Sequence, residues 1–188
     1  MEKVEINKSM RLTPHFTLGE LCKTKHDTED GNIPSRVAIE NLKRICENWL
    51  EDLRYSYNML YVPSWVRPQS KVAGDCTLAP DPGAALDPGA APEFAEEAIV
   101  INSGYRSPEV NRLAGGATNS NHLSGCAVDI RCAGKEQMIR YASILLDIAD
   151  GTKQDFDELL LEQHGSVCWL HFAVRPQGNR RRIEFLKV

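Results

Sequence analysis

The order of its periodic segments limits what this chain can fold into. Apolar residues recur at helical spacing over 37–53 and again over 135–150. Strand-like runs gather mainly in the last third and cover 98–101, 127–131, 156–162, 167–174 and 182–187. Helices that precede a cluster of strands predict an α+β fold and disfavour an alternating β-α-β arrangement.

Local signals indicate where several helices begin and end. Thr17 and Glu20 form a capping-box pattern at the start of a short helix. Ser107-Pro108 is an N-cap and first-turn pair for another, which we expect to end at Gly115-Gly116. Gly151 is expected to close the helix over 135–150. A longer helix is predicted after Pro34-Ser35, with a core-facing stripe of Val37, Leu42, Ile45, Trp49 and Leu53.

Length and charge restrict the class of protein. The 188 residues predict a single domain, 1–188, with a Pro/Ala/Gly-rich insertion loop at about 67–98. The formal charge of −4 disfavours a nucleic-acid partner. No apolar run reaches the roughly 18 residues of a membrane span, and the first eight residues lack the apolar core of a signal peptide. We therefore expect a monomer made in the cytoplasm.

The six cysteines are scattered and form no CxxC pair, which argues against a zinc ribbon or a thioredoxin-type motif. We expect reduced, packed thiols. Paired cysteines in a redox or secreted protein are the alternative, which thiol counting under denaturing conditions would decide.

A charged residue within an apolar strand points to a metal site. Asp129 lies between Val128 and Ile130, and a carboxylate there needs a compensating partner. His122 precedes it by seven residues, an odd separation that would put the two on opposite faces of one regular strand. Gly125 can turn the chain between them, so both side chains could converge on one zinc ion.

A third ligand is expected among the remaining histidines. His171 lies in the apolar run 167–174, where an imidazole is either a satisfied core residue or a ligand, and the nearby pair favours the ligand. His15 and His26 lie among polar residues, and His164 lies in a predicted turn over 163–166. These three are interpreted as incidental.

Peptide hydrolysis at such a zinc needs a general base beside the water. With a four-residue turn at 163–166, Glu162 would pair with Val167, and Glu158, Glu162, Trp169 and His171 would share one face. Glu162 and Glu158 are then the candidates. For Glu158, which follows Asp155 and Asp157, a plain surface carboxylate is the favoured interpretation.

Several motifs together resemble the zinc D-Ala-D-Ala carboxypeptidases, peptidase family M15. They are Ser-Gly-Tyr-Arg-Ser at 103–107, Ser-x-His-x-x-Gly-x-Ala-x-Asp at 120–129, Phe-Asp-x-Leu-x-x-Glu at 156–162 and Trp-Leu-His at 169–171. The resemblance covers about residues 13–175. It is greatest to the peptidase domain shared by these carboxypeptidases and phage murein endopeptidases, the endolysin-like members.

The resemblance implies a hedgehog-like α+β fold whose antiparallel sheet carries a zinc ion. By position, His122, Asp129 and His171 are the implied ligands, and Arg106 is the implied catalytic residue that supports the substrate carbonyl and its developing oxyanion. Ser120 falls on a substrate-binding position. Some branches place the catalytic carboxylate three residues before the last histidine, where this chain has Cys168. The hedgehog-type arrangement places it at the end of the preceding strand, where Glu162 falls.

We therefore expect a zinc metallopeptidase that cleaves peptidoglycan stem or cross-link peptides, as a carboxypeptidase or an endopeptidase acting at the cell wall. The alternative is a catalytically silent, zinc-stabilised module that binds cell-wall peptides. The basic run at 179–182 is interpreted as a solvated turn, with contact to the anionic cell-wall polymer as the alternative.

Overall fold

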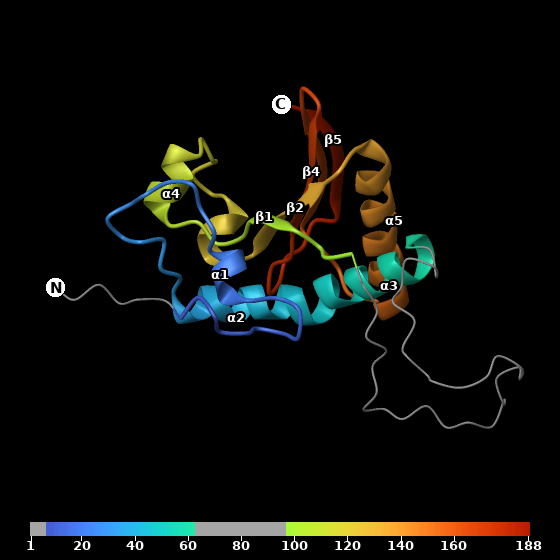
Figure 1. The fold of residues 1–188 in the computed structure, drawn as a ribbon, viewed down its shortest axis with the longest axis horizontal. Helices are drawn as coiled ribbons and strands as arrows, with labels where there is room; N and C mark the ends of the chain where they lie inside the picture. Colours follow the sequence, from blue (N-terminus) through green and yellow to red (C-terminus); the bar gives the residue numbers. More distant parts are fainter. Residues whose placement is uncertain (1–6, 63–96) are drawn as a thin grey trace, which may run out of the picture.

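The computed structural model of the protein describes residues 7–62 and 97–188. Helices and a five-stranded sheet form an α+β fold, as expected (Figure 1). The predicted insertion loop at 67–98 lies, except for its last two residues, outside the described residues. The helices are α1 Leu18–Leu21, α2 Arg36–Ile45, η1 Cys46–Leu50, α3 Glu51–Tyr61, α4 Pro108–Leu113, η2 Asn121–Ser124 and α5 Lys135–Thr152. The strands are β1 Ile101–Ser103, β2 Ala127–Cys132, β3 Glu158–His164, β4 Val167–Ala173 and β5 Arg182–Lys187.

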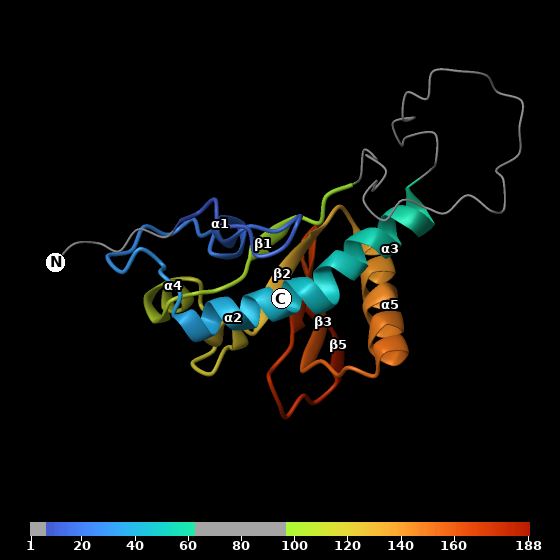
Figure 2. The same cartoon turned by 90° about the horizontal axis from the view of Figure 1, so that it is seen from below.

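The first long helix is continuous from α2 through the π-helical turn η1 into α3, and Figure 2 shows it as one rod across the fold. Ser35 caps its start by accepting a hydrogen bond from the Ala38 amide. Four of the five residues of the predicted stripe are buried, whereas Val37 is exposed and the neighbouring Ala38 is buried in the same turn. The ring of Trp49 packs against Phe156 and Phe172, at centroid distances of 6.3 and 5.0 Å. This helix therefore covers the apolar face of the sheet.

The sheet has the strand order β1-β2-β4-β3-β5. Neighbouring strands are antiparallel except β3 and β5, which are parallel. β4 ends at Ala173, opposite Glu158 at the start of β3, and the following connection places Arg182 beside that same residue. Because both strands then run from the same end, their parallel direction follows from the short connection at 174–181.

Alternation along the strands separates two faces of the sheet. Even-numbered residues of β2 and β4, such as Val128 and Phe172, are fully buried in the core. Odd-numbered residues of these strands lie on the other face, which carries the polar side chains described below. The core of the protein is therefore on one side of the sheet and the candidate site on the other.

Several predicted boundaries are wrong, among them the strand expected at 156–162, which is β3, Glu158–His164. The strand expected at 98–101 is β1, Ile101–Ser103, since pairing with β2 begins only at Ile101. The helix α5 continues through Gly151 and ends at Thr152, and its C-cap residue Lys153 adopts a left-handed conformation. The β3–β4 turn has two residues, Gly165 and Ser166, because Gly165 takes the positive φ of 58° that so tight a turn requires. Within the described ranges, no helix is both long and apolar enough to cross a membrane.

Candidate metal centre

Two neighbouring strands place Asp129 and His171 directly opposite each other. Asp129 of β2 is the register partner of His171 of β4, and both lie on the polar face of the sheet. Val128 and Ile130 face the core, fully buried, as the alternation predicts. The carboxylate oxygen Oδ1 of Asp129 is 2.9 Å from Nδ1 of His171.

His122 reaches this pair from the short helix η2. Gly125 ends that helix with a φ of 69°, and a Cβ atom there would lie 2.4 Å from the carbonyl oxygen of Ala38. Only glycine fits this turn without strain, so the predicted bend between His122 and Asp129 is confirmed. Ser120 caps η2 and accepts a hydrogen bond from the His122 amide, and the Arg106 amide donates to the His122 carbonyl.

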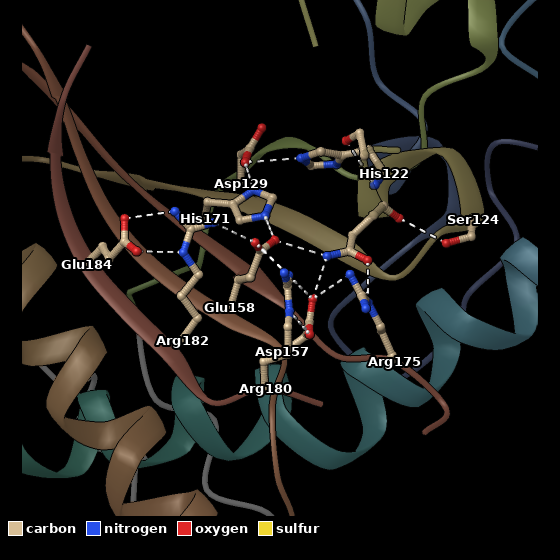
Figure 3. Close-up of polar contacts among 12 residues, drawn as sticks. His122, Ser124, Asp129, Asp157, Glu158, His171, Arg175, Arg180, Arg182 and Glu184 are labelled. Atoms are coloured by element: carbon tan, nitrogen blue, oxygen red, sulfur yellow. Dashed lines mark hydrogen bonds and ion pairs between the residues drawn. The ribbon is translucent and has the colours of Figure 1, made fainter. Parts of the chain in front are cut away.

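The three side chains converge on a small volume (Figure 3). Nε2 of His122 lies 3.3 Å from Oδ1 of Asp129, and one donor atom from each of the three residues falls within 4.8 Å of the others. His122 and Asp129 are buried and His171 is largely buried. Two imidazoles and a carboxylate are a donor set that zinc prefers, and three protein ligands leave one position of a tetrahedral ion for water or substrate.

In each of the two histidines, the ring nitrogen that is not a candidate metal donor also has the surroundings expected of a metal-bound histidine. Nδ1 of His122 lies 2.5 Å from the carbonyl oxygen of Gly104, and Nε2 of His171 lies 3.6 Å from Oε2 of Glu158. Metal-binding histidines usually donate their second N–H to a carbonyl or a carboxylate, which fixes the ring and its tautomer. The residues present therefore fit a zinc ion held by Nε2 of His122, a carboxylate oxygen of Asp129 and Nδ1 of His171.

The electrostatics of the cluster show how strongly these groups interact. Burial alone would raise the pKa of Asp129, but the two imidazoles hold it well below its usual range. Burial would likewise lower the pKa of His171, but hydrogen bonds with Asp129 and Glu158 raise it above the ordinary value of about 6.5. Without a metal ion, the site therefore favours an anionic Asp129 beside a protonated His171.

Arg106 lies at the edge of the same cluster. One guanidinium nitrogen contacts Oδ2 of Asp129, and Nε donates to the Ser103 hydroxyl at 2.8 Å. Arg106 therefore occupies the second oxygen of Asp129 and leaves Oδ1 to the histidines. Its guanidinium also lines the cleft beside the cluster.

A network beneath His171 was not expected from the sequence. Glu158, interpreted as a surface carboxylate, is mostly buried: it accepts hydrogen bonds from Asn121, Arg180 and Arg182 at 2.8 to 3.1 Å and contacts His171. This interpretation of Glu158 is wrong because the basic run at 179–182, expected to be solvated, folds back onto β3. Contact with His171, together with these hydrogen bonds and charges, lowers the pKa of Glu158.

Asp157 is the buried centre of this network. It is fully buried and accepts two hydrogen bonds from Arg180, each 2.8 Å, while Asn121 and Arg175 contact its Oδ2 at 2.9 and 3.0 Å. Because Asn121 precedes His122 in η2, the network ties that helix to β3. Asn121 lies within the motif at 120–129 and Asp157 within the motif at 156–162, and their place in these motifs is the sequence signal that could have pointed to the network.

Glu162 lies on the same sheet face in a different setting. Its register partner is Trp169, and not Val167 as the four-residue turn predicted, because the turn is two residues shorter. This shift keeps the same face, so Glu158, Glu162, Trp169 and His171 do share it. Burial raises the pKa of Glu162, and no cation in the described part of the chain forms an ion pair with it.

A cleft of about 960 Å³ opens over the cluster. Its lining residues come from the segment between α1 and α2, from α4 and the residues that lead into η2, and from the five strands of the sheet. The three candidate ligands, Arg106, Ser120 and Glu162 all line it. His26 also lines it, whereas His15 contacts Glu51 and His164 contacts the Val188 carbonyl outside the cluster. Cys168 is buried on the core face, away from the cleft.

Comparison with known families agrees with this geometry. Residues 91–156 match the family model described as Peptidase M15. This segment of the chain is similar to peptidase M15. The match covers about a third of the chain and includes Arg106, His122 and Asp129, whereas His171 and Glu162 lie beyond it and are placed by the fold. No curated protein matches the chain.

The similarity of residues 91–156 to peptidase M15 and the converging triad together indicate a metallopeptidase acting on peptides. The expectation of family and fold class is thereby confirmed. The five cysteines in the described ranges are unpaired, and Cys76 lies outside those ranges.

Proposed function

We propose that this protein is a zinc peptidase that hydrolyses peptide bonds in bacterial peptidoglycan stem or cross-link peptides. The observation that carries the proposal is the convergence of His122, Asp129 and His171 at the floor of a cleft that Glu162 and Arg106 also line. Bound zinc would lower the pKa of its water ligand to about 7 and polarise the scissile carbonyl. The cell wall as substrate, and as site of action, comes from the resemblance of the motif set.

Glu162 is the proposed general base. It is diagonal to His171 across β3 and β4, and such pairs lie about 7–8 Å apart, which leaves room for a water molecule between them. A partly buried carboxylate with a raised pKa holds a proton more readily than Glu158, whose oxygens already accept several hydrogen bonds. Glu162 would take the proton as the water oxygen bonds to the carbonyl carbon, then give it to the leaving amine as the C–N bond breaks.

Arg106 and Ser120 have proposed roles in substrate binding. The guanidinium of Arg106 is anchored by Ser103 and Asp129 at the cleft, where its remaining N–H groups can donate to an oxyanion. Ser120 is at the N-cap of η2, where its hydroxyl accepts a hydrogen bond from the His122 amide, and it lines the cleft. A substrate carbonyl between them would lie close to the three candidate ligands.

Mass spectrometry of purified peptidoglycan fragments tests the proposal. Zinc-loaded protein is expected to release new fragments whose masses identify the bond, and chelation or the Glu162→Gln substitution is expected to abolish them. The Glu162→Gln variant should retain one zinc ion per chain, and Glu136→Gln, an exposed change on α5, serves as the matched control. Full activity in Glu162→Gln would remove the base role from this residue. Bound zinc without any product from varied stem peptides would favour a silent binding module.

A further inference from the structure

One wall of the cleft carries positive charge that the protein does not neutralise. Lys23 and Lys25 follow α1, are exposed and line the cleft. Among the described residues, no carboxylate lies within the 4.0 Å of an ion pair from either ammonium group. The acidic residues of the same segment, Asp27, Glu29 and Asp30, are not among the described residues that line the cleft.

The other cations of the cleft are different, because each already has a carboxylate partner. Arg106 contacts Asp129, and Arg175 contacts Asp157 at 3.0 Å. Arg180 contacts Asp157 and Glu158 at 2.8 Å, and Arg182 contacts Glu158 and Glu184 at 3.1 and 2.6 Å. These arginines are therefore part of the internal network. The two lysines are left to interact with a bound molecule.

Hydrogen bonds fix the lysine segment to the connection between β1 and α4, which carries Arg106. The Tyr105 amide donates to the Leu21 carbonyl at 2.7 Å, and a Cβ atom on Gly104 would lie 2.3 Å from that oxygen. Asn32, 1% exposed, donates to the carbonyls of Cys22 and Tyr105 and accepts from the Ser107 amide at 2.7 Å. The backbone on either side of the lysines is thus held at a set distance from the candidate metal centre.

We propose that Lys23 and Lys25 form a subsite for a carboxylate group of the peptide substrate, an inference that rests on the proposed function. The charges of the cleft are arranged to orient such a substrate. Glu162, on β3, lines the cleft without an ion-pair partner and repels an anionic end, whereas Lys23 and Lys25, in the segment after α1, attract it. The scissile bond then lies over the metal centre. The carboxylate is either the C-terminal group or a side-chain group of the peptide.

Steady-state kinetics of the zinc-loaded protein on three synthetic stem peptides test this inference. One peptide has all carboxylates free, the second has a C-terminal amide and the third has its side-chain carboxylates amidated. For the free peptide, the Lys23→Gln/Lys25→Gln variant should raise KM about 3- to 30-fold with kcat nearly unchanged, and added salt should shrink the difference. Lys135→Gln, an exposed lysine on α5 outside the cleft lining, is the matched control and should change neither constant.

The amidated peptides identify the group that is bound. If the lysine substitutions no longer change KM for one of the amidated peptides, that peptide lacks the recognised carboxylate. If this peptide is the one with the C-terminal amide, the lysines bind the C-terminal carboxylate, which indicates a carboxypeptidase mode. An unchanged KM in the double variant for every peptide would overturn the inference.

Calorimetric titration of the free peptide into zinc-loaded Glu162→Gln protein separates this inference from the proposed function. If the wild type releases no product but the lysine substitutions still weaken binding in that background, the proposed peptidase fails while the subsite stands. Equal binding with and without the lysines, or no binding at all, overturns the subsite.

Discussion

His171 is held at both nitrogens of its ring. Nδ1 lies 2.9 Å from Asp129 and Nε2 lies 3.6 Å from Glu158, so two carboxylates determine its orientation. One of these carboxylates is a candidate ligand and the other lies behind the ring. The same contacts raise the pKa of the imidazole, which has consequences for metal binding.

Zinc affinity should increase with pH through the neutral range. A proton on Nδ1 of His171 must leave before that atom can bind a metal ion, and its pKa is raised above about 6.5. Below the raised pKa, each unit of pH should therefore increase the apparent affinity about tenfold while one proton is displaced. Competition with a chromophoric chelator at pH 6, 7 and 8 measures this dependence. An affinity that does not change over this range would contradict it.

Glu158→Ala should weaken zinc binding by about 10- to 100-fold, because His171 loses the acceptor that orients its ring. Glu184→Ala is the matched control, since Glu184 also contacts Arg182 but forms no ion pair with His171. Chelator competition gives the affinity, and circular dichroism checks that both variants are folded. Equal affinities in the two variants would show that Glu158 does not position His171.

At the scale of elements, glycine has opposite roles in two places. Gly125 ends η2 in a left-handed conformation against the Ala38 carbonyl, whereas Gly151 is within α5 with open space around its Cα. Gly125→Ala should lower the free energy of unfolding by at least about 1–2 kcal/mol, since both the backbone conformation and the space oppose a side chain. Gly151→Ala should raise it by about 0.5–1 kcal/mol. Urea unfolding measures both, and equal signs would contradict the assigned conformations.

Local chemistry made many elements predictable. The cap residues Ser35 and Ser107 and the capping box at Thr17 act within a few residues, so the sequence alone located these helix starts. The β3–β4 register was not predictable because it depends on turn length, which Gly165 shortens to two residues. The residues were still assigned to the correct faces of the sheet, because a turn that is two residues shorter preserves the alternation of side chains along the strands. The parallel β5 depends on a connection whose path only the tertiary fold determines.

The candidate site was predictable to the same extent. His122, Asp129 and Arg106 lie in compact motifs and His171 lies in an apolar strand, so each could be identified as a candidate from its local sequence. The network of Asn121, Asp157 and Glu158 was not, because Arg180 and Arg182 come from a basic run more than twenty residues away in the chain. Charge pairing across that distance leaves no local periodicity.

At the scale of the molecule, buried charge should make the fold sensitive to acid. Burial alone would raise the pKa of Asp157, but hydrogen bonds from Arg180 and Asn121 and the nearby arginine charges lower it. A carboxylate whose pKa is lowered on folding stabilises the protein at pH values above its pKa in the unfolded state, about 3.9. This contribution is lost as the pH falls through its pKa in the folded state. Asp157→Asn should therefore destabilise the protein by on the order of 3 kcal/mol at neutral pH, with a smaller loss below about pH 4.

Urea unfolding at pH 7, 5 and 3 measures this prediction. Asp150→Asn, an exposed partner of Arg181, is the control and should change stability by less than about 1 kcal/mol at each pH. A constant difference between Asp157→Asn and wild type across the three values would contradict the linkage.

Val188 lines the cleft, with its amide bonded to the Gln163 carbonyl and its own carbonyl to His164. Figure 1 shows this end of the chain at the top of the sheet, beside β4 and β5. A peptide fused after Val188 would begin at the rim of the candidate site, so its effective concentration there would be in the millimolar range for a short flexible linker. Weak ligands tethered in this way would occupy the cleft without tight affinity of their own, whereas an affinity tag at the same end would compete with substrate.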